Sequence, residues 1–274
     1  MPIRKLPEAD IRSICASQAL SSPVFVVKEL VENALDAGAK SITIEIAANT
    51  IDVIRVTDDG YGVPPEDREL LAQRHCTSKL SSFLELESLG GRSYGFRGAA
   101  LASLAELSAS LYITTKVEGE VVATTYHLNP DGSIAGTKVA SHAVGTTVRA
   151  VDLLDRLPVR REQMVKQADR TIAAITGLLG AYAFCRSETR VRFKVLKEQN
   201  SKRSWCYTPE PMATLKQIAS QIIGAEAASQ LQESQAELPL LEEGDNLDPD
   251  HPVEHISVRM LSILGHSGLY LSIA

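Results

Sequence analysis

Two short groups of residues near the N-terminus carry side chains that could act on a nucleotide. Glu29 and Asn33 lie four apart in a segment typical of a helix, and Asp58, Gly60 and Gly62 follow further along the chain. Residues four apart on a helix share one face, so a carboxylate that orients a water could stand one turn from an amide oxygen that holds magnesium. An aspartate can accept from the amino group of an adenine, and glycines let the backbone approach the base. This pattern favours ATP binding without a P-loop, and it allows hydrolysis.

Each group also has an ordinary structural explanation. Glu29 and Asn33 alone would fit the solvated face of an amphipathic helix, and Asp58-Asp59-Gly60 alone would fit a tight turn. Lys79 alone is an ordinary surface lysine, distinguished only by its place beside Thr77-Ser78. The combination of these groups and their order along the chain is what favours a nucleotide site.

Hydrophobic periodicity outlines the elements that must position these residues. Ser22-Pro23 predicts a helix start, and this helix is expected to run to Ala37 and to stop at Gly38. Residues 75–98 are rich in Ser and Gly, which predicts a mobile lid loop. The same criteria predict helices at 11–20, 64–74, 99–107, 162–184 and 212–231, and strands at 41–47, 52–57, 111–116, 121–128, 133–140, 146–151, 189–197, 256–263 and 270–274.

Composition narrows the class of protein. The chain has 274 residues, of which 44% are hydrophobic and 23% are charged, as in ordinary globular proteins. We expect no membrane partner, because no apolar run approaches the length of a span and the N-terminus has no signal-peptide pattern. The four cysteines form no C-x-x-C pair, which argues against a zinc site or a disulfide framework.

The net charge of −6 is unevenly distributed along the chain. Residues 156–203 hold twelve Lys or Arg against four Asp or Glu, which makes this segment a candidate for DNA phosphate contacts. From charge alone, a solvated surface is the better interpretation. Residues 233–254 hold eight acids and no Lys or Arg, and we expect a disordered insert there.

The order of the motifs resembles that of MutL-type mismatch-repair proteins, which belong to the GHKL ATPase superfamily. The matching motifs are Glu29–Asn33–Asp36-Ala37-Gly38-Ala39, Asp58-x-Gly60-x-Gly62, Thr77-Ser78-Lys79, Gly95-Phe96-Arg97-Gly98 and Gly145-Thr146-Thr147-Val148. The start of the chain, Cys15-Ala16-Ser17-Gln18, is similar to that of PMS-type subunits. The resemblance covers roughly residues 1–200.

The resemblance implies an α+β fold, the GHKL two-layer α/β sandwich with a mixed, mostly antiparallel sheet backed by helices. Residues 1–200 would form the ATPase domain. Residues 201–274 would form part of a ribosomal-S5-like second domain with the acidic insert 233–254.

The resemblance also implies site roles. Glu29 would be the general base, Asn33 would ligate Mg²⁺, and Asp58 would read the adenine with Thr147 nearby. Gly62 would pack against the base. The lid would include Thr77, Ser78 and Lys79, and the backbone N–H groups that bind phosphate would come from Gly95, Phe96, Arg97, Gly98, Ala99, Ala100 and Leu101. Leu157–Arg161 resembles the family's Pro-x-Arg-Arg segment, and Arg160 and Arg161 are the first candidates for DNA contact.

Two residues depart from the family pattern. Asp59 stands where Asn is usual and adds charge near the site, and Ala99 replaces a Glu, which weakens lid closure if that Glu anchors the lid. The family's second domain supplies a lysine to the γ-phosphate, and the chain is expected to end before that loop. The family's C-terminal dimerisation domain is likewise expected to be missing, as in a fragment or truncated product.

Two functions therefore remain open. The first is an ATPase of mismatch repair that uses ATP and Mg²⁺, dimerises around DNA with an MLH-type partner subunit, and acts in the nucleus; Glu29 and Asn33 favour it. The alternative is a poorly hydrolysing ATP-binding module that acts through a MutL-family partner, favoured by Ala99, Asp59 and the absent lysine. Another GHKL protein, such as a kinase, lacks support because no phospho-acceptor histidine box is visible.

Overall fold

The computed structural model describes residues 4, 6–76, 94–95, 98–197, 203–239, 255–263 and 271–273. The chain divides into two compact units, one of residues 1–179 with 189–208 and one of residues 180–188 with 209–274. The predicted boundary at residue 200 differs from this division because strand β8 (Trp205–Tyr207) pairs with β7 (Arg190–Leu196) in the first unit. The ribosomal-S5-like nature of the second unit stays a prediction.

The first unit is built on an eight-stranded sheet in the order β5-β4-β3-β6-β2-β1-β7-β8. Strands β1 and β7 are parallel, and the other neighbouring pairs are antiparallel. The remaining bounds are β1 Ser41–Ala47, β2 Val53–Asp58, β3 Ser108–Lys116, β4 Ala123–Leu128, β5 Ile134–Ala140 and β6 Gly145–Leu153. The predicted mixed, mostly antiparallel sheet is confirmed.

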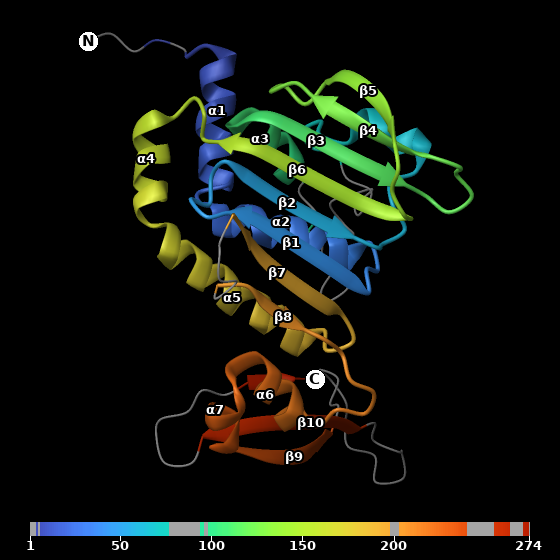
Figure 1. Ribbon diagram of the computed structural model, residues 1–274, viewed down its shortest axis with the longest axis vertical. Helices are drawn as coiled ribbons and strands as arrows, with labels where there is room; N and C mark the ends of the chain where they lie inside the picture. Colours follow the sequence, from blue (N-terminus) through green and yellow to red (C-terminus); the bar gives the residue numbers. More distant parts are fainter. Residues whose placement is uncertain are drawn as a thin grey trace, which may run out of the picture. The chain divides into compact units, whose positions relative to one another are not determined.

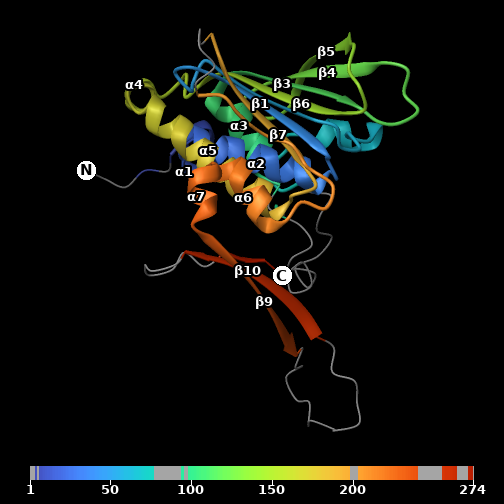
Figure 2. The same ribbon diagram turned by 60° about the horizontal axis from the view of Figure 1, so that its bottom comes forward.

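Helices cover one face of this sheet, and the other face is open (Figures 1 and 2). They are α1 (Glu8–Ala19), α2 (Pro23–Asp36), α3 (Ala100–Leu107) and the first-unit part of α5 (Ala168–Cys185). Alternate strand residues face the helices and are buried, as Ile42, Ile44 and Ile46 are on β1. This is the predicted two-layer α/β sandwich.

Two predicted helices of the first unit differ from the observed ones. The segment expected at 64–74 forms a short 3-10 helix, η1 (Pro65–Leu70). The single helix expected at 162–184 is divided into α4 (Pro158–Lys166) and α5, because the backbone leaves the helical conformation at Gln167. No single described helix is long and apolar enough to cross a membrane; α1 and α2 meet that test only as a pair bent by 77°.

The second unit contains α6 (Leu215–Ile223), α7 (Ala225–Ser229) and a three-stranded antiparallel sheet in the order β11-β10-β9. The helix predicted at 212–231 is interrupted because Gly224, with φ of +88°, ends α6. The strands are β9 (Leu231–Pro239), β10 (His255–Ile263) and β11 (Leu271–Ile273). The disorder predicted for 233–254 is wrong for residues 233–239. Their backbone pairs with β10, and backbone pairing does not depend on the acidic side chains. Residues 240–254 lie outside the described ranges.

Candidate nucleotide site

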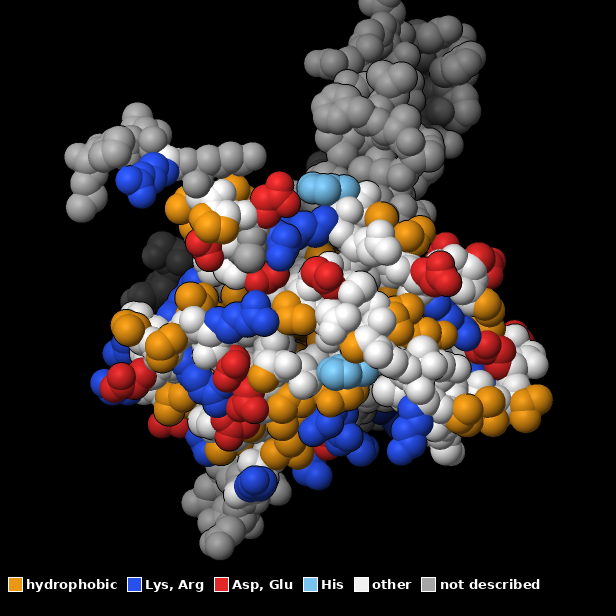
Figure 3. Space-filling view, turned by 90° about the horizontal axis from the view of Figure 1, so that it is seen from above, with side chains coloured by type: hydrophobic (Ala, Val, Ile, Leu, Met, Phe, Trp, Pro, Cys, Tyr) orange, Lys and Arg blue, Asp and Glu red, His pale blue; other side chains and the backbone are white. Residues whose placement is uncertain are grey.

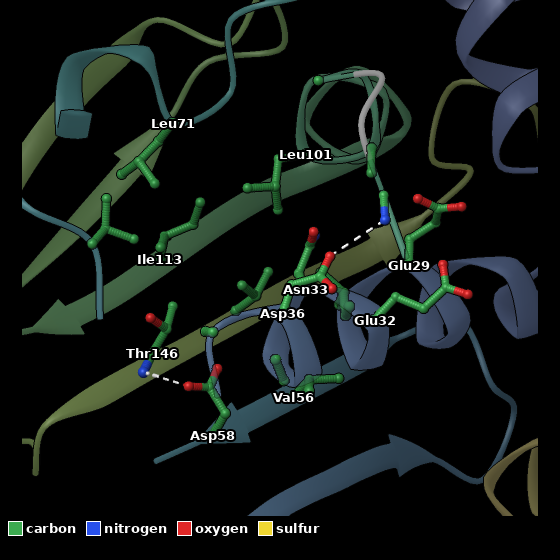
Figure 4. A pocket seen from close by; sticks show the side chains of 18 of the residues that line it. Glu29, Glu32, Asn33, Asp36, Val56, Asp58, Leu71, Leu101, Ile113 and Thr146 are labelled. Carbon is green, nitrogen blue, oxygen red and sulfur yellow. Dashed lines mark hydrogen bonds between the residues drawn. The ribbon is translucent and has the colours of Figure 1, made fainter. Parts of the chain in front are cut away.

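A cavity of about 760 Å³ lies on the helix-covered side of the sheet in the first unit. Its walls come from α2, η1, the first turn of α3 and strands β2, β3 and β6 (Figure 4). Nine of the residues that we expected at a nucleotide site line it: Glu29, Asn33, Asp58, Gly62, Gly95, Gly98, Ala99, Ala100 and Leu101. The volume falls within the range of about 300–1,000 Å³ usual for small-molecule sites.

Five further expected residues lie outside the described residues. They are Thr77, Ser78, Lys79, Phe96 and Arg97. Their roles in a lid or at the phosphates stay predictions, as does the mobility predicted for the loop at 75–98.

Helix α2 places its polar residues on one side of the cavity. Pro23 occupies the first turn, and the apolar stripe that includes Val27 and Val31 is buried on the opposite side of the helix. The helical spacing therefore presents Glu29 and Asn33 to the cavity, as predicted (Figure 4). The side chain of Glu29 is 34% exposed, so its carboxylate can meet solvent water.

Asp58 lies at the other side of the cavity, at the end of β2 (Figure 4). Its Oδ1 accepts hydrogen bonds from the backbone N–H groups of Gly60 at 2.9 Å and Thr146 at 3.2 Å. Its Oδ2 makes no hydrogen bond with the described residues. Burial raises the pKa of Asp58 above its ordinary value, and the two backbone hydrogen bonds oppose that rise. One carboxylate oxygen is therefore fixed, and the other remains an acceptor for a ligand.

Gly62 permits a close approach of two backbone segments beside Asp58. Its φ is +76°, and a Cβ at this position would lie 2.3 Å from the carbonyl oxygen of Lys116. A side chain would therefore clash with β3 and strain the backbone. The contact of Gly62 with the base stays a prediction, and the close approach to Lys116 is a separate reason for glycine at this position.

Backbone N–H groups on the α3 side of the cavity suit an anion. The N–H of Gly95 donates to Oδ2 of Asp36 at 3.3 Å, and that of Tyr94 donates to Oδ1 at 3.0 Å. Ala99 is the N-cap of α3 and provides no side-chain cap for the first-turn N–H groups. The first-turn N–H groups of α3 therefore have no side-chain cap, and a helix N-terminus of this kind favours phosphate.

Thr147 is not at the cavity, and this prediction needs correction. Thr147 pairs with Thr57 across β2 and β6, and its hydroxyl contacts Thr57 Oγ1 at 2.9 Å and His142 Nε2 at 2.7 Å. Its neighbour Thr146 pairs with Asp58 and lines the cavity. Because successive strand residues point to opposite faces, the second threonine of the motif faces away from the nucleotide side. Strand alternation counted from Asp58 could have identified Thr146.

Arg160 and Arg161 make internal contacts, and their assignment as DNA contacts stays a prediction. Arg160 donates to the carbonyl oxygens of Ser17 at 3.0 Å and Ser21 at 2.7 Å. Arg161 Nη2 contacts the carboxylates of Asp52 at 3.1 Å and Asp152 at 2.8 Å. Both side chains are partly buried, so these guanidinium groups join α4 to the rest of the first unit.

Asp59 has a structural partner outside the cavity. Its Oδ1 accepts the backbone N–H groups of Lys40 and Ser41, both at 2.8 Å. The carboxylate therefore fixes the start of β1. Its charge also raises the pKa of Asp58, although burial is the largest cause of that rise.

The residues present fit a magnesium ion held mainly by a nucleotide. No cluster of three or more His, Cys, Asp or Glu suited to a metal occurs among the described residues. Mg²⁺ is commonly bound by one or two protein groups together with substrate phosphates and waters. The side-chain amide of Asn33 in the cavity wall suits that mode.

Comparison with known proteins finds similarity to an ATPase family and to mismatch-repair proteins. Residues 21–149 match the family described as histidine kinase-, DNA gyrase B-, and HSP90-like ATPase. Mismatch repair endonuclease pms1 of Dictyostelium discoideum is 36% identical over 69% of this chain, PMS1 protein homolog 1 of Homo sapiens is 37% identical over 70%, and DNA mismatch repair protein MutL of Shewanella piezotolerans is 40% identical over 62%. The chain spans only 18%, 20% and 27% of the length of these relatives, respectively.

Solved structures with a similar fold agree with these relatives. A structure described as the N terminal domain of a DNA repair protein has a TM-score of 0.74 and 26% identity, covering 94% of this chain and 72% of that one. The Aquifex aeolicus MutL ATPase domain complexed with ADP has a TM-score of 0.58 and 25% identity, covering 90% of this chain and 78% of that one.

Proposed function

We propose that this chain, which carries a GHKL ATPase domain of the MutL/PMS type, binds ATP and hydrolyses it with Mg²⁺. The observation that carries the proposal is the arrangement of one cavity. Glu29 and Asn33 stand on one wall, Asp58 stands across from them, and the uncapped first turn of α3 completes the wall.

The adenine would bind beside Asp58. Oδ2 of Asp58 is available to accept from the adenine amino group, and Gly62 lines the same cavity, where the base would pack against it. Thr146, rather than Thr147, places a hydroxyl on this side. A buried acceptor of this kind discriminates against a base that cannot donate to it.

The phosphates would bind at Gly95 and at Gly98 to Leu101. The backbone N–H of Gly95 already hydrogen-bonds an anionic group, the carboxylate of Asp36, and the phosphate oxygens would compete for that donor. Asn33 would hold Mg²⁺, which neutralises phosphate charge when bound. Glu29 would accept a proton from the attacking water, which its partial exposure allows.

Replacing Glu29 with alanine tests this function. We expect hydrolysis to fall by about 10²–10⁴-fold, the usual contribution of a positioned general base, while ATP binding is kept. Steady-state product formation and titration with a fluorescent ATP analogue measure the two quantities. Glu162→Ala on the exposed face of α4 is the matched control, and equal hydrolysis in wild type and Glu29→Ala would remove Glu29 from the mechanism.

The alternative is a module that binds ATP and hydrolyses it poorly until a MutL-family partner is present. Hydrolysis by the chain alone that is lost in Glu29→Ala supports the first case, whereas hydrolysis that occurs only after an MLH-type subunit is added supports the alternative. N-terminal dimerisation, the clamp around DNA and a nuclear location belong to this proposal and rest on the PMS-type relatives. Bacterial MutL proteins match at similar identity, so fractionation of cells of the source organism must decide the location.

DNA contact is best supported on the open face of the sheet. Arg190, Arg192 and Lys194 alternate along β7 and are exposed on that face, and their side chains make no hydrogen bond or ion pair with the described residues. Alternate strand residues are about 7 Å apart, which sets three cations in a row along the strand. Such a row of cations favours contact with a phosphate backbone, without sequence preference. By contrast, the end of the molecule drawn in Figure 3 mixes acidic with basic side chains.

The triple variant R190Q/R192Q/K194Q tests this surface. We expect weaker duplex DNA binding and a log–log salt dependence shallower by about 2–3, because each lost phosphate contact removes about 0.9 from the slope. Fluorescence anisotropy at several salt concentrations measures both. The control is K166Q/R170Q/K216Q, which removes three exposed cations that lie on helices rather than on this sheet face; equal losses in both variants would reduce the effect to net charge.

A further inference from the structure

Lys28 stands between two carboxylates at the wall of the nucleotide cavity. Its ammonium lies 2.8 Å from Oε2 of Glu32 and 3.7 Å from Oε1 of Glu29. The Glu32 side chain is 9% exposed, whereas those of Lys28 and Glu29 are 36% and 34% exposed. All three residues line the cavity. The buried Glu32 therefore fixes the position of the ammonium beside the candidate base.

Helix stability does not account for this arrangement. A Lys four residues before a Glu is the less favourable order for such a pair on a helix. Glu29 and Glu32 lie three apart on the same side, and like charges at such spacing repel. The cation between them offsets that repulsion and allows both carboxylates to stay on the cavity wall.

We propose that Lys28, fixed by Glu32, is a positioning residue that holds the Glu29 carboxylate in the orientation needed for hydrolysis. The proposal rests on the proposed role of Glu29 as general base. The distance of 3.7 Å is important because it permits attraction but is too long for a hydrogen bond. Lys28 orients the carboxylate without using the lone pairs that must accept the proton of the attacking water.

The experiment compares steady-state hydrolysis and nucleotide affinity in variants of the full chain. Lys28→Met alone would remove the ammonium from beside the buried carboxylate of Glu32, which threatens folding. The main variant is therefore K28M/E32Q, which removes both charges and keeps similar shapes. We expect kcat to fall about tenfold with KM changed less than about twofold, since misplaced reacting groups lose rate rather than binding.

Two further variants test the mechanism. Lys28→Arg keeps a cation that Glu32 can hold, and we expect it to keep a kcat within about threefold of wild type. Lys166→Met removes the same kind of residue from an exposed i,i+4 pair with Glu162, and we expect no change in kcat. Circular dichroism and melting curves verify that each variant is folded.

Three outcomes overturn the inference or its premise. A wild-type kcat in folded K28M/E32Q, together with lost hydrolysis in Glu29→Ala, overturns the positioning role and leaves the proposed function standing. A loss of affinity for ATP but not ADP, at unchanged kcat, assigns Lys28 to the terminal phosphate instead and also overturns it. Undiminished hydrolysis in Glu29→Ala removes the premise itself.

Discussion

The two faces of the large sheet use neighbouring residues of the same strands for different purposes. On β2 and β6, Asp58 and Thr146 face the helices and line the cavity, whereas Thr57 and Thr147 face the open side. The cavity side holds a buried carboxylate with one oxygen that no described residue hydrogen-bonds. The comparison shows that the same residue type acquires a binding or a structural role through the side of the sheet on which it lies.

On the open face, the polar groups mostly satisfy one another. Five threonines stand in register across five strands: Thr125, Thr114, Thr147, Thr57 and Thr43. The hydroxyls of Thr114 and Thr125 lie 2.7 Å apart, and those of Thr57 and Thr147 lie 2.9 Å apart. Such cross-strand pairs stabilise a sheet. The row ends at Arg192 on β7, where exposed cations make this face suited to a polyanion.

Asp58→Asn should change the cavity side most strongly. Loss of the carboxylate acceptor should weaken ATP binding by about 1.5–3 kcal/mol, or roughly tenfold to a hundredfold. Fluorescence titration measures this loss, which should exceed any loss of binding in Glu29→Ala. Comparable affinity of wild type for ATP and GTP would contradict the assignment of Asp58 as the base reader.

The same substitution should stabilise the fold at neutral pH. The pKa of Asp58 is raised in the folded state, chiefly by burial, so wild type loses stability as pH rises through that pKa. Below the ordinary value of 3.8 the carboxyl is protonated in both states, and the advantage of the variant should vanish. Melting curves at pH 7 and at a pH below 3.8 test this sign, and lower stability of the variant at pH 7 would refute it.

Thr146→Val and Thr147→Val form a matched pair across the sheet. Thr146→Val should weaken ATP binding by about two- to tenfold if its hydroxyl contacts the nucleotide, the range for one neutral hydrogen bond. Thr147→Val should leave ATP binding unchanged and lower stability slightly, because it removes contacts with Thr57 and His142. The reverse pattern in an affinity titration would overturn the placement of the two faces.

Glu120→Gln should produce the smallest effect. Arg68 on η1 donates two hydrogen bonds to Glu120 at 2.8 and 2.7 Å, and it lowers the pKa of Glu120 to about 2. This pair anchors η1, which supplies Asp67 and Leu70 to the cavity wall. Because a depressed pKa stabilises the fold above the ordinary value of 4.5, the variant should melt slightly lower than wild type at pH 7.

That difference should disappear as pH falls from 4.5 through about 2, where the carboxylate of wild type is protonated. Melting temperatures across this range are the measurement, with Glu162→Gln as the exposed control. A difference that persists at pH 2 would mean that the shape of Glu120, rather than its charge, supports η1.

The sequence determined the parts of the site that depend on local geometry. Helical spacing alone places Glu29 and Asn33 on one face of α2, and the alternation of β1 and β2 was readable because each strand buries every second residue. Asp58 and Gly62 were identified because a strand end followed by a glycine turn is also a local pattern. Gly224 shows the opposite case, since its left-handed conformation interrupted a helix that composition had favoured.

Only the tertiary structure decided which side chains reach the ligand and which hold the fold. Thr146 and Thr147 differ only in the face that pairing of β6 with β2 gives them. Arg160, Arg161 and Asp59 are occupied by groups that are remote in sequence, such as Ser21, Asp52 and Lys40. Helix and strand periodicity fix the direction of a side chain relative to its own element, but its partners depend on how the elements pack together.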